Sequence, residues 1–227
     1  MKRLLFAGAG LAIAMTSALG ADVPPARSLP LPRTVATYVP FFTRNGFYVC
    51  LNAGYGFGKS QWTDTITQIS TNKFSTKGGM VGGTAGYNWQ LSTFVLGLEG
   101  DIDWSGIKGS TTINCISTCQ TSNSWLGTAR GRIGYAFDRF LPYVTAGAAF
   151  GEVKGSVAGF GSFSQTKVGW TGGAGLEYAF TDNWTTKLEY LYVDLGKATC
   201  NAACSGGDPF NVTFKSSIVR AGVNYKF

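Results

Sequence analysis

The sequence predicts an all-β protein, specifically an eight-stranded antiparallel up-and-down transmembrane β-barrel. Three observations support this fold class. The 227 residues include 32 glycines together with 6 Trp, 10 Tyr and 16 Phe, but only 12 acidic residues. Glycine is a poor helix former, by about 1 kcal/mol relative to alanine, whereas aromatic residues favour strands. Eight segments alternate in polarity with a period of two, and the last of them ends on Phe227.

The N-terminal 20 residues have the pattern of a secretory signal peptide. Lys2 and Arg3 precede an uncharged stretch from Leu4 to Met15, and small residues follow at Ala18 and Gly20. This order predicts export, with cleavage after Gly20 or one residue later. The apolar stretch is shorter than the about 20 residues that a membrane-spanning helix needs, and no longer one follows.

Residues 21–45 are predicted to form a proline-rich periplasmic linker, because they hold five of the seven prolines. An alternative is a periplasmic tail that contacts the cell wall or another acidic surface through Arg27, Arg33 and Arg44.

Residues 46–227 are predicted to form the barrel. The connections after the second, fourth and sixth segments are only a few residues long, whereas the others are long. This alternation is typical of barrels with short periplasmic turns, long extracellular loops and both termini in the periplasm. Each segment is long enough to span a membrane as a tilted strand, which takes about 9 to 11 residues. The predicted strands are 47–57, 79–89, 94–104, 125–137, 141–151, 167–180, 184–195 and 212–227.

A soluble barrel of the lipocalin type has the same alternation with the opposite face turned inward. Two features favour the membrane barrel. Glycines such as Gly54 and Gly82 fall on the polar face, where a narrow interior leaves little room. Aromatic residues near strand ends indicate girdles at the two membrane interfaces; they are Trp89, Trp104, Trp125, Trp170, Trp184, Tyr225 and Phe227.

Nine charged residues fall on the predicted inward face, since lipid would penalise them by about 2 to 4 kcal/mol for each arginine. Counting from the shared periplasmic end places Glu99 level with Arg132 and Asp101 level with Arg130. We interpret the set as ion pairs that fill a polar lumen; a gated ion path, a proton relay or a catalytic carboxylate pair are alternatives. The set is Glu99, Asp101, Asp103, Arg130, Arg132, Glu177, Lys187, Glu189 and Arg220.

Four of the five cysteines form two equal spacings, Cys115 with Cys119 and Cys200 with Cys204. In an exported protein these predict disulfides. Local pairing within each loop is the simplest arrangement; pairing between loops and a four-thiolate zinc site are alternatives. Cys50, which faces inward, is predicted to stay unpaired.

The chain has no histidine, so it lacks the usual general base and the commonest metal and haem ligand. We therefore predict neither an enzyme nor a cofactor. Lysines near the ends of the long loops predict attraction to phosphorylated lipids of an outer leaflet. Nucleic-acid binding is not predicted.

Several motifs together resemble the small alphaproteobacterial outer-membrane β-barrel proteins, the porin family that shares the barrel of the OmpA transmembrane domain. They are residues 46–58, 86–90, 125–135, 141–145, 176–178 and 187–192. Cys50 and the lack of histidine depart from this pattern, and the second weakens the haemin binding proposed for some relatives.

The resemblance implies a protein of the bacterial outer membrane with a structural and surface-interaction role. Its extracellular loops would contact lipopolysaccharide, the host or the environment; the alternative is a narrow or gated porin-like channel. It also implies that Arg130, Arg132 and Glu177 are structural residues. The barrel assembly machinery would recognise the last strand through Val223, Tyr225 and Phe227.

Overall fold

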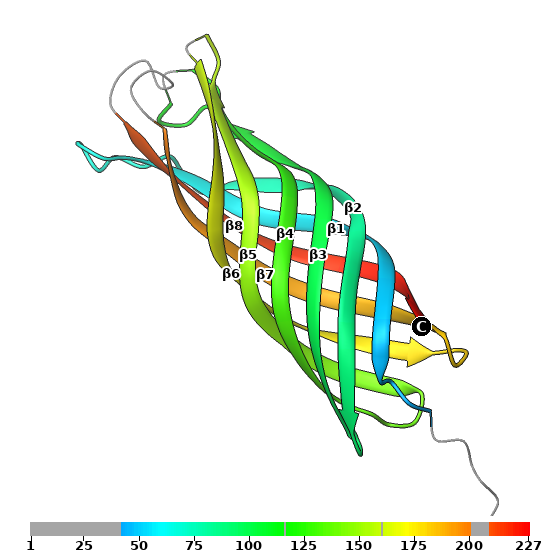
Figure 1. Ribbon diagram of the computed structural model, residues 1–227. Coiled ribbons are helices and arrows are strands. Elements are labelled where there is room, and N and C mark those ends of the chain that lie inside the picture. Colours follow the sequence, from blue (N-terminus) through cyan, green and yellow to red (C-terminus); the bar gives the residue numbers. More distant parts are fainter. Residues whose placement is uncertain (1–41, 116, 160, 201–208) are drawn as a thin grey trace, which may run out of the picture. The chain divides into compact units, whose positions relative to one another are not determined.

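The computed structural model describes residues 42–115, 117–159, 161–200 and 209–227. The predicted signal peptide, nearly all of the linker and the Cys200–Cys204 pairing lie outside this part of the chain. The described residues form one closed barrel in which each strand pairs antiparallel with its neighbours and β1 pairs with β8. This confirms the predicted fold class (Figure 1). The strands are β1 (Gly46–Asp64), β2 (Phe74–Leu91), β3 (Phe94–Thr111), β4 (Cys119–Tyr135), β5 (Phe140–Val157), β6 (Gly161–Ala179), β7 (Trp184–Cys200) and β8 (Phe210–Lys226).

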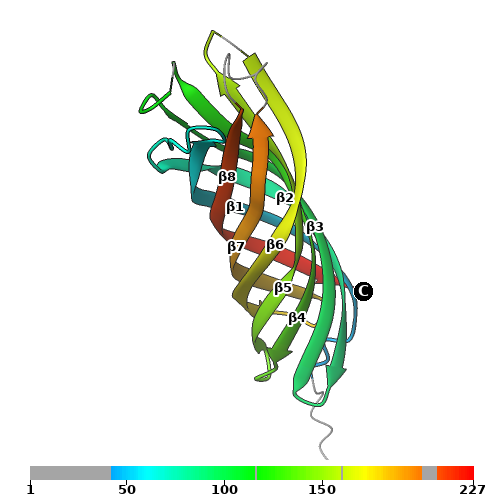
Figure 2. The same cartoon turned by 90° about the vertical axis from the view of Figure 1, so that its left-hand side faces the viewer.

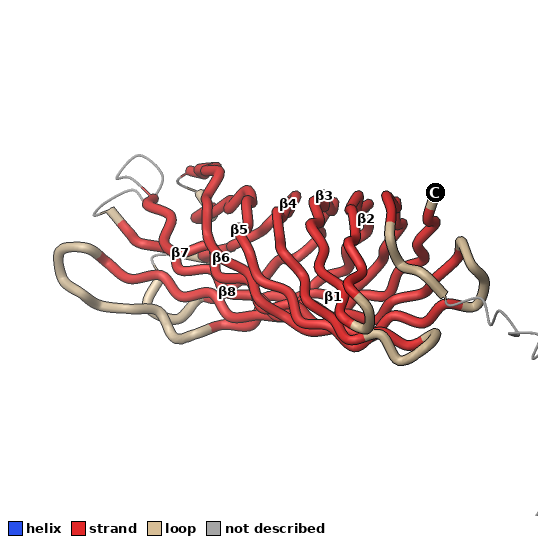
Figure 3. The backbone as a smooth tube through the Cα atoms, turned by 60° about the horizontal axis from the view of Figure 1, so that its bottom comes forward, coloured by secondary structure: helices blue, strands red, loops and turns tan. Residues whose placement is uncertain are grey.

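The three connections that the sequence predicted to be short all lie at one end of the barrel. The β2–β3, β4–β5 and β6–β7 turns lie with the C-terminus toward one end, and the remaining connections lie at the opposite end (Figures 1 and 2). In Figure 3 the described part of the chain is coloured as strand or loop throughout. No helix in the described residues is long and apolar enough to cross a membrane. We call the two ends periplasmic and extracellular, following the rule for even-numbered barrels.

The strands extend well beyond the predicted segments at the extracellular end. β1 continues to Asp64 instead of stopping at residue 57, and β2 begins at Phe74 instead of residue 79. Each strand has 17 to 19 residues. The long loops expected from the sequence are therefore mostly strand, and the connections at this end reduce to 65–73, 112–118, 158–160 and 201–209.

The polarity pattern inverts along strands such as β1 and β8, which explains why these extensions escape a membrane-strand pattern. Near the periplasmic end of β8, Val223 faces outward and Asn224 inward. In the extracellular half of the same strand, Phe214 is buried inside while Lys215 is exposed outside. The outer wall contacts lipid in the first half and water in the second, so the apolar face changes sides.

Bulges accompany this change. The register shifts between Trp104 and Ile107 in β3 and between Asn123 and Leu126 in β4, and a third shift lies in β7 after Asp194. A bulge adds one unpaired residue and strengthens the local twist. Trp104 is the last lipid-facing aromatic of β3, with 67% of its surface exposed, and Ile107 directly after the bulge is buried. The bulge of β3 therefore lies where the membrane-facing wall ends.

Two aromatic belts flank the apolar outer wall. Trp170 lies 5.4 Å from Tyr192 between ring centroids in the extracellular belt. At the periplasmic end Trp184 lies 4.9 Å from Tyr225. Of the aromatics predicted for these girdles, Trp125 is only half-exposed, because it sits inside the bulge of β4. Aromatic belts of this kind mark the two membrane interfaces.

Candidate functional site: the barrel interior

The nine charged side chains predicted to face inward are all buried in the lumen. Arg220 on β8 lies at the centre of a group that it forms with Asp101, Asp103 and Glu189. Its guanidinium lies 2.7 Å from Asp103, 3.1 Å from Asp101 and 2.8 Å from Glu189. Room for this contact comes from glycine, because a Cβ at Gly54 would lie 2.6 Å from the Arg220 Cβ. Arg220 of β8 thus contacts β1, β3 and β7.

Arg130 and Arg132 on β4 connect this group with the periplasmic end. Arg130 contacts Glu99 at 3.0 Å and Asp101 at 2.9 Å, and Arg132 contacts Glu99 at 3.0 Å. Arg132 also pairs at 3.0 Å with Glu177 of β6, two strands away in the barrel. The amine of Lys187 lies 4.0 Å from Glu99. Long arginine side chains therefore join non-adjacent strands across the interior.

The strand register differs by two residues from the one counted from the sequence. Glu99 lies directly opposite Arg130, not Arg132. The count assumed that the fourth strand continues to residue 137, whereas β4 ends at Tyr135 and Asp138 in the following turn has φ = 51°. Arg132 still reaches Glu99, because its side chain extends diagonally across the ladder.

Arg44 is a lumen residue that the sequence reasoning assigned to the linker. Its side chain is buried at the periplasmic mouth, where one guanidinium nitrogen lies 3.3 Å from Glu177. Another donates to the backbone carbonyl of Arg139 at 2.7 Å. With Arg44 this group of paired charges holds five basic and five acidic side chains, so the formal charge of the group is balanced. Its position two residues before Gly46, where the first strand begins, was the available signal.

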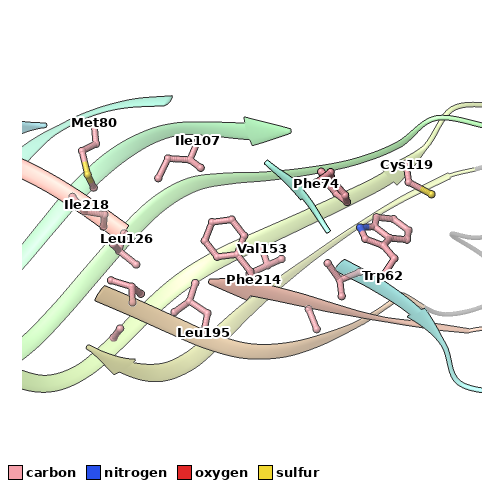
Figure 4. Packing of buried hydrophobic residues seen from close by; sticks show 14 of the residues in the cluster. Trp62, Phe74, Met80, Ile107, Cys119, Leu126, Val153, Leu195, Phe214 and Ile218 are labelled. Carbon is pink, nitrogen blue, oxygen red and sulfur yellow. The ribbon is translucent and has the colours of Figure 1, made fainter. Parts of the chain in front are cut away.

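The extracellular half of the lumen is apolar, which the sequence reasoning did not predict. Side chains from β1, β2, β3 and β8 point into the same space (Figure 4); they are Trp62, Phe74, Ile107, Phe214 and Ile218. Trp62 is fully buried and donates through Nε1 to Thr121 Oγ1 at 2.9 Å. The side chains of this layer, which we call the apolar layer, are Trp62, Phe74, Met80, Ile107, Leu126, Val153, Leu191, Val193, Leu195, Val212, Phe214 and Ile218.

The lumen is thus filled in two layers, one ionic and one apolar. The carboxylates of Glu99 and Asp101 are each held by at least two cationic side chains. Carboxylates bound in this way are already engaged by cations of the barrel itself. An eight-stranded barrel has an interior just wide enough for side chains. The geometry suits a structural filling that fixes strand positions.

Cys115 and Cys119 form a disulfide at the extracellular end, which confirms local pairing in this loop. Cys119 begins β4 and is buried against the apolar layer. Cys50 is buried and unpaired within the described residues, and its sulfur would lie 2.7 Å from a Cβ at Gly222.

The C-terminal residues lie on the outside of the periplasmic rim. Val223 and Phe227 are exposed outward, while Arg220 is buried inside. The ring of Phe227 lies 5.2 Å from Tyr225 and 5.9 Å from Phe47 of β1. The last residue therefore belongs to the seam where β8 closes the barrel against β1.

A closed barrel with an apolar outer wall, two aromatic belts and an interior filled by an ionic and an apolar layer defines an integral outer-membrane β-barrel protein. The chain belongs to the outer membrane protein beta-barrel domain family, whose model matches residues 36–227. It is 39% identical to a 31 kDa outer-membrane immunogenic protein of Brucella melitensis over the whole of both chains. It is 32% identical to a 25 kDa outer-membrane immunogenic protein of Brucella abortus, covering 100% of this chain and 99% of the relative.

Among solved structures, the barrel resembles the outer membrane protein OprG of Pseudomonas aeruginosa. The TM-score is 0.51 at 15% identity, covering 81% of this chain and 97% of OprG. At that identity the likeness shows the fold alone. The family and the relatives place the protein in the bacterial outer membrane, as the sequence predicted.

Proposed function

We propose that the protein is a non-conducting outer-membrane barrel with a structural and surface-interaction role. The observation that carries this proposal is the filled lumen, in which the apolar layer lies above the ionic layer. Ions that cross the barrel would have to pass the packed side chains of Trp62, Phe214 and Ile218. An ion would lose its hydration shell there, and burying an unpaired charge among apolar side chains is costly. The narrow channel considered from the sequence would require both layers to rearrange.

The surface role is supported by the extended strands and by the relatives. The extracellular halves of the strands carry short connections, and Cys115–Cys119 closes one of them. The names of the relatives describe them as immunogenic. We infer that these connections are the part of the protein that meets lipopolysaccharide, the host or the environment.

Single-channel recording tests the proposal. Refolded protein in a planar bilayer is expected to give no steady conductance steps, with an open porin in the same membranes as the positive control. Folding is verified by the change in gel mobility between unboiled and boiled samples. Reproducible steps from protein with the folded mobility would overturn the non-conducting role and favour the channel.

A further inference from the structure

We propose that three lysines on the outer wall of β1, β2 and β3 bind the phosphate groups of an outer-leaflet glycolipid. We call Lys59, Lys77 and Lys108 the lysine cluster. All three are exposed and outward-facing. The inference extends the proposed surface role to a defined site and a defined ligand chemistry.

The register places like charges against one another. Lys77 on β2 lies directly opposite Lys108 on β3. Lys59 pairs with Ser75, so it is a diagonal neighbour of Lys77 across the β1–β2 ladder. Like charges directly opposite one another destabilise a sheet. An anion that bridges the amines would remove this repulsion.

The protein supplies carboxylates to other lysines of the same rim. Lys154 pairs with Glu152 at 3.1 Å, and Lys215 pairs with Asp194 at 2.8 Å. Within the described residues no acidic side chain forms an ion pair with any member of the lysine cluster. Lys73, Lys167 and Lys197 also lack an ion pair among the described residues, so the direct opposition of Lys77 and Lys108 is what distinguishes the cluster.

A surface hollow of about 790 Å³ adjoins the cluster. Lys59, Lys73, Lys77 and Lys215 line it together with the hydroxyl residues Ser75 and Ser217, and Lys108 lies beside it, opposite Lys77. Ammonium and hydroxyl groups are the side-chain donors that phosphate oxygens accept from. The hollow is therefore suited to a phosphorylated group larger than a single ion.

The height of the cluster matches a lipid headgroup. Phe57, two residues before Lys59, and Trp104, four residues before Lys108, are exposed on the same outer wall. Aromatic residues of this kind lie at the membrane interface. A lipid whose acyl chains lie along the wall below would thus present its phosphates at the level of the lysines.

Lipid titration of the folded full-length barrel tests the site. Detergent-folded protein is titrated with bisphosphorylated lipid A, with dephosphorylated lipid A and with inorganic phosphate, and binding is followed by tryptophan fluorescence. We expect tight binding only for bisphosphorylated lipid A. The combined variant K59Q/K77Q/K108Q is expected to weaken it about a hundredfold, the combined effect of three lysines at an anionic lipid surface.

The matched control is K154Q/K167Q/K197Q, which removes the same net charge from outside the cluster and is expected to bind almost as the unmodified protein does. Equal losses in both variants would overturn the site, since they indicate diffuse attraction. If dephosphorylated lipid A binds as tightly as bisphosphorylated lipid A, the role of phosphate is overturned. If inorganic phosphate binds as tightly as bisphosphorylated lipid A, the role of the lipid is overturned. Conductance with intact lipid binding would refute the proposed function and leave this inference standing.

Discussion

At the scale of single residues, Arg132 shows how the lumen accommodates charge. Its guanidinium pairs with Glu99 and Glu177 and donates to Asn88 at 3.0 Å. It also lies over the aromatic rings of Tyr48 and Tyr143, 5.0 and 5.2 Å from the ring centroids. Removing one partner of a buried ion pair costs more than the pair contributes, because the other charge stays buried and uncompensated. The residues around Arg132 therefore depend on its charge.

Arg132→Ala is expected to lower the free energy of unfolding by about 3 to 5 kcal/mol. Arg44→Ala is expected to cost less, because Arg132 still pairs with Glu177 at 3.0 Å when Arg44 is absent. Urea titration of both variants in lipid vesicles measures the difference. Lys154→Ala, at an exposed ion pair, is the control and is expected to change stability little. An Arg132→Ala barrel as resistant to urea as the unmodified protein would contradict the electrostatic account.

At the scale of elements, β1 shows how two environments divide one strand. Its periplasmic half places Leu51 outward, with 79% exposure, and Asn52 inward, whereas its extracellular half buries Trp62 completely. The membrane half follows the inward-polar pattern of a transmembrane strand, and the outer half follows the inward-apolar pattern of a soluble barrel. Each half is stabilised by a different kind of core.

Trp62→Ala is expected to destabilise the barrel by about 3 to 5 kcal/mol, the usual cost of deleting a buried aromatic side chain. Trp62→Phe retains most of the volume, so its loss is expected to be smaller. The midpoint of the heat-induced gel shift measures both. Ile66→Ala, in a connection where Ile66 is 66% exposed, provides the control. A Trp62→Ala midpoint equal to that of Ile66→Ala would show that the apolar layer contributes no stability.

The sequence predicted the membrane halves of the strands well, because lipid imposes one polarity rule along each of them. It did not predict their extracellular halves, where Ser, Thr, Lys and Gly on the outer face resemble loop composition. Arg44 was missed for a related reason: the preceding prolines dominate the composition of residues 21–45. The register of β4 depended on where its turn begins, which alternation alone does not define.

At the scale of the whole molecule, closure depends on the pairing of the first and last strands. β8 pairs with β1 along its length, from Tyr48 opposite Lys226 to Asp64 opposite Phe210. The backbone of Phe227 donates to the carbonyl of Phe47 at 3.0 Å. The chain terminus is therefore part of the seam.

Deleting Phe227 is expected to lower the yield of heat-modifiable barrel in the outer membrane, if the assembly machinery recognises the last strand as the family resemblance implies. Quantitative blots of unboiled membranes measure the folded fraction. Phe137→Ala removes another exposed aromatic side chain from a periplasmic turn and is expected to insert normally. Normal insertion after the deletion would leave the β8 pairing intact and remove the signal role.

The extension of the strands also determines how far the protein reaches from the cell. A strand of 17 to 19 residues exceeds the about 9 to 11 residues needed to cross the bilayer by about eight. At about 3.4 Å per residue, this surplus is roughly 25 Å along the strand. Under the surface role proposed above, the extracellular connections stand above the lipid headgroups on a stiff, hydrogen-bonded cylinder. A large molecule that approaches the cell would then meet these connections before it reaches the membrane.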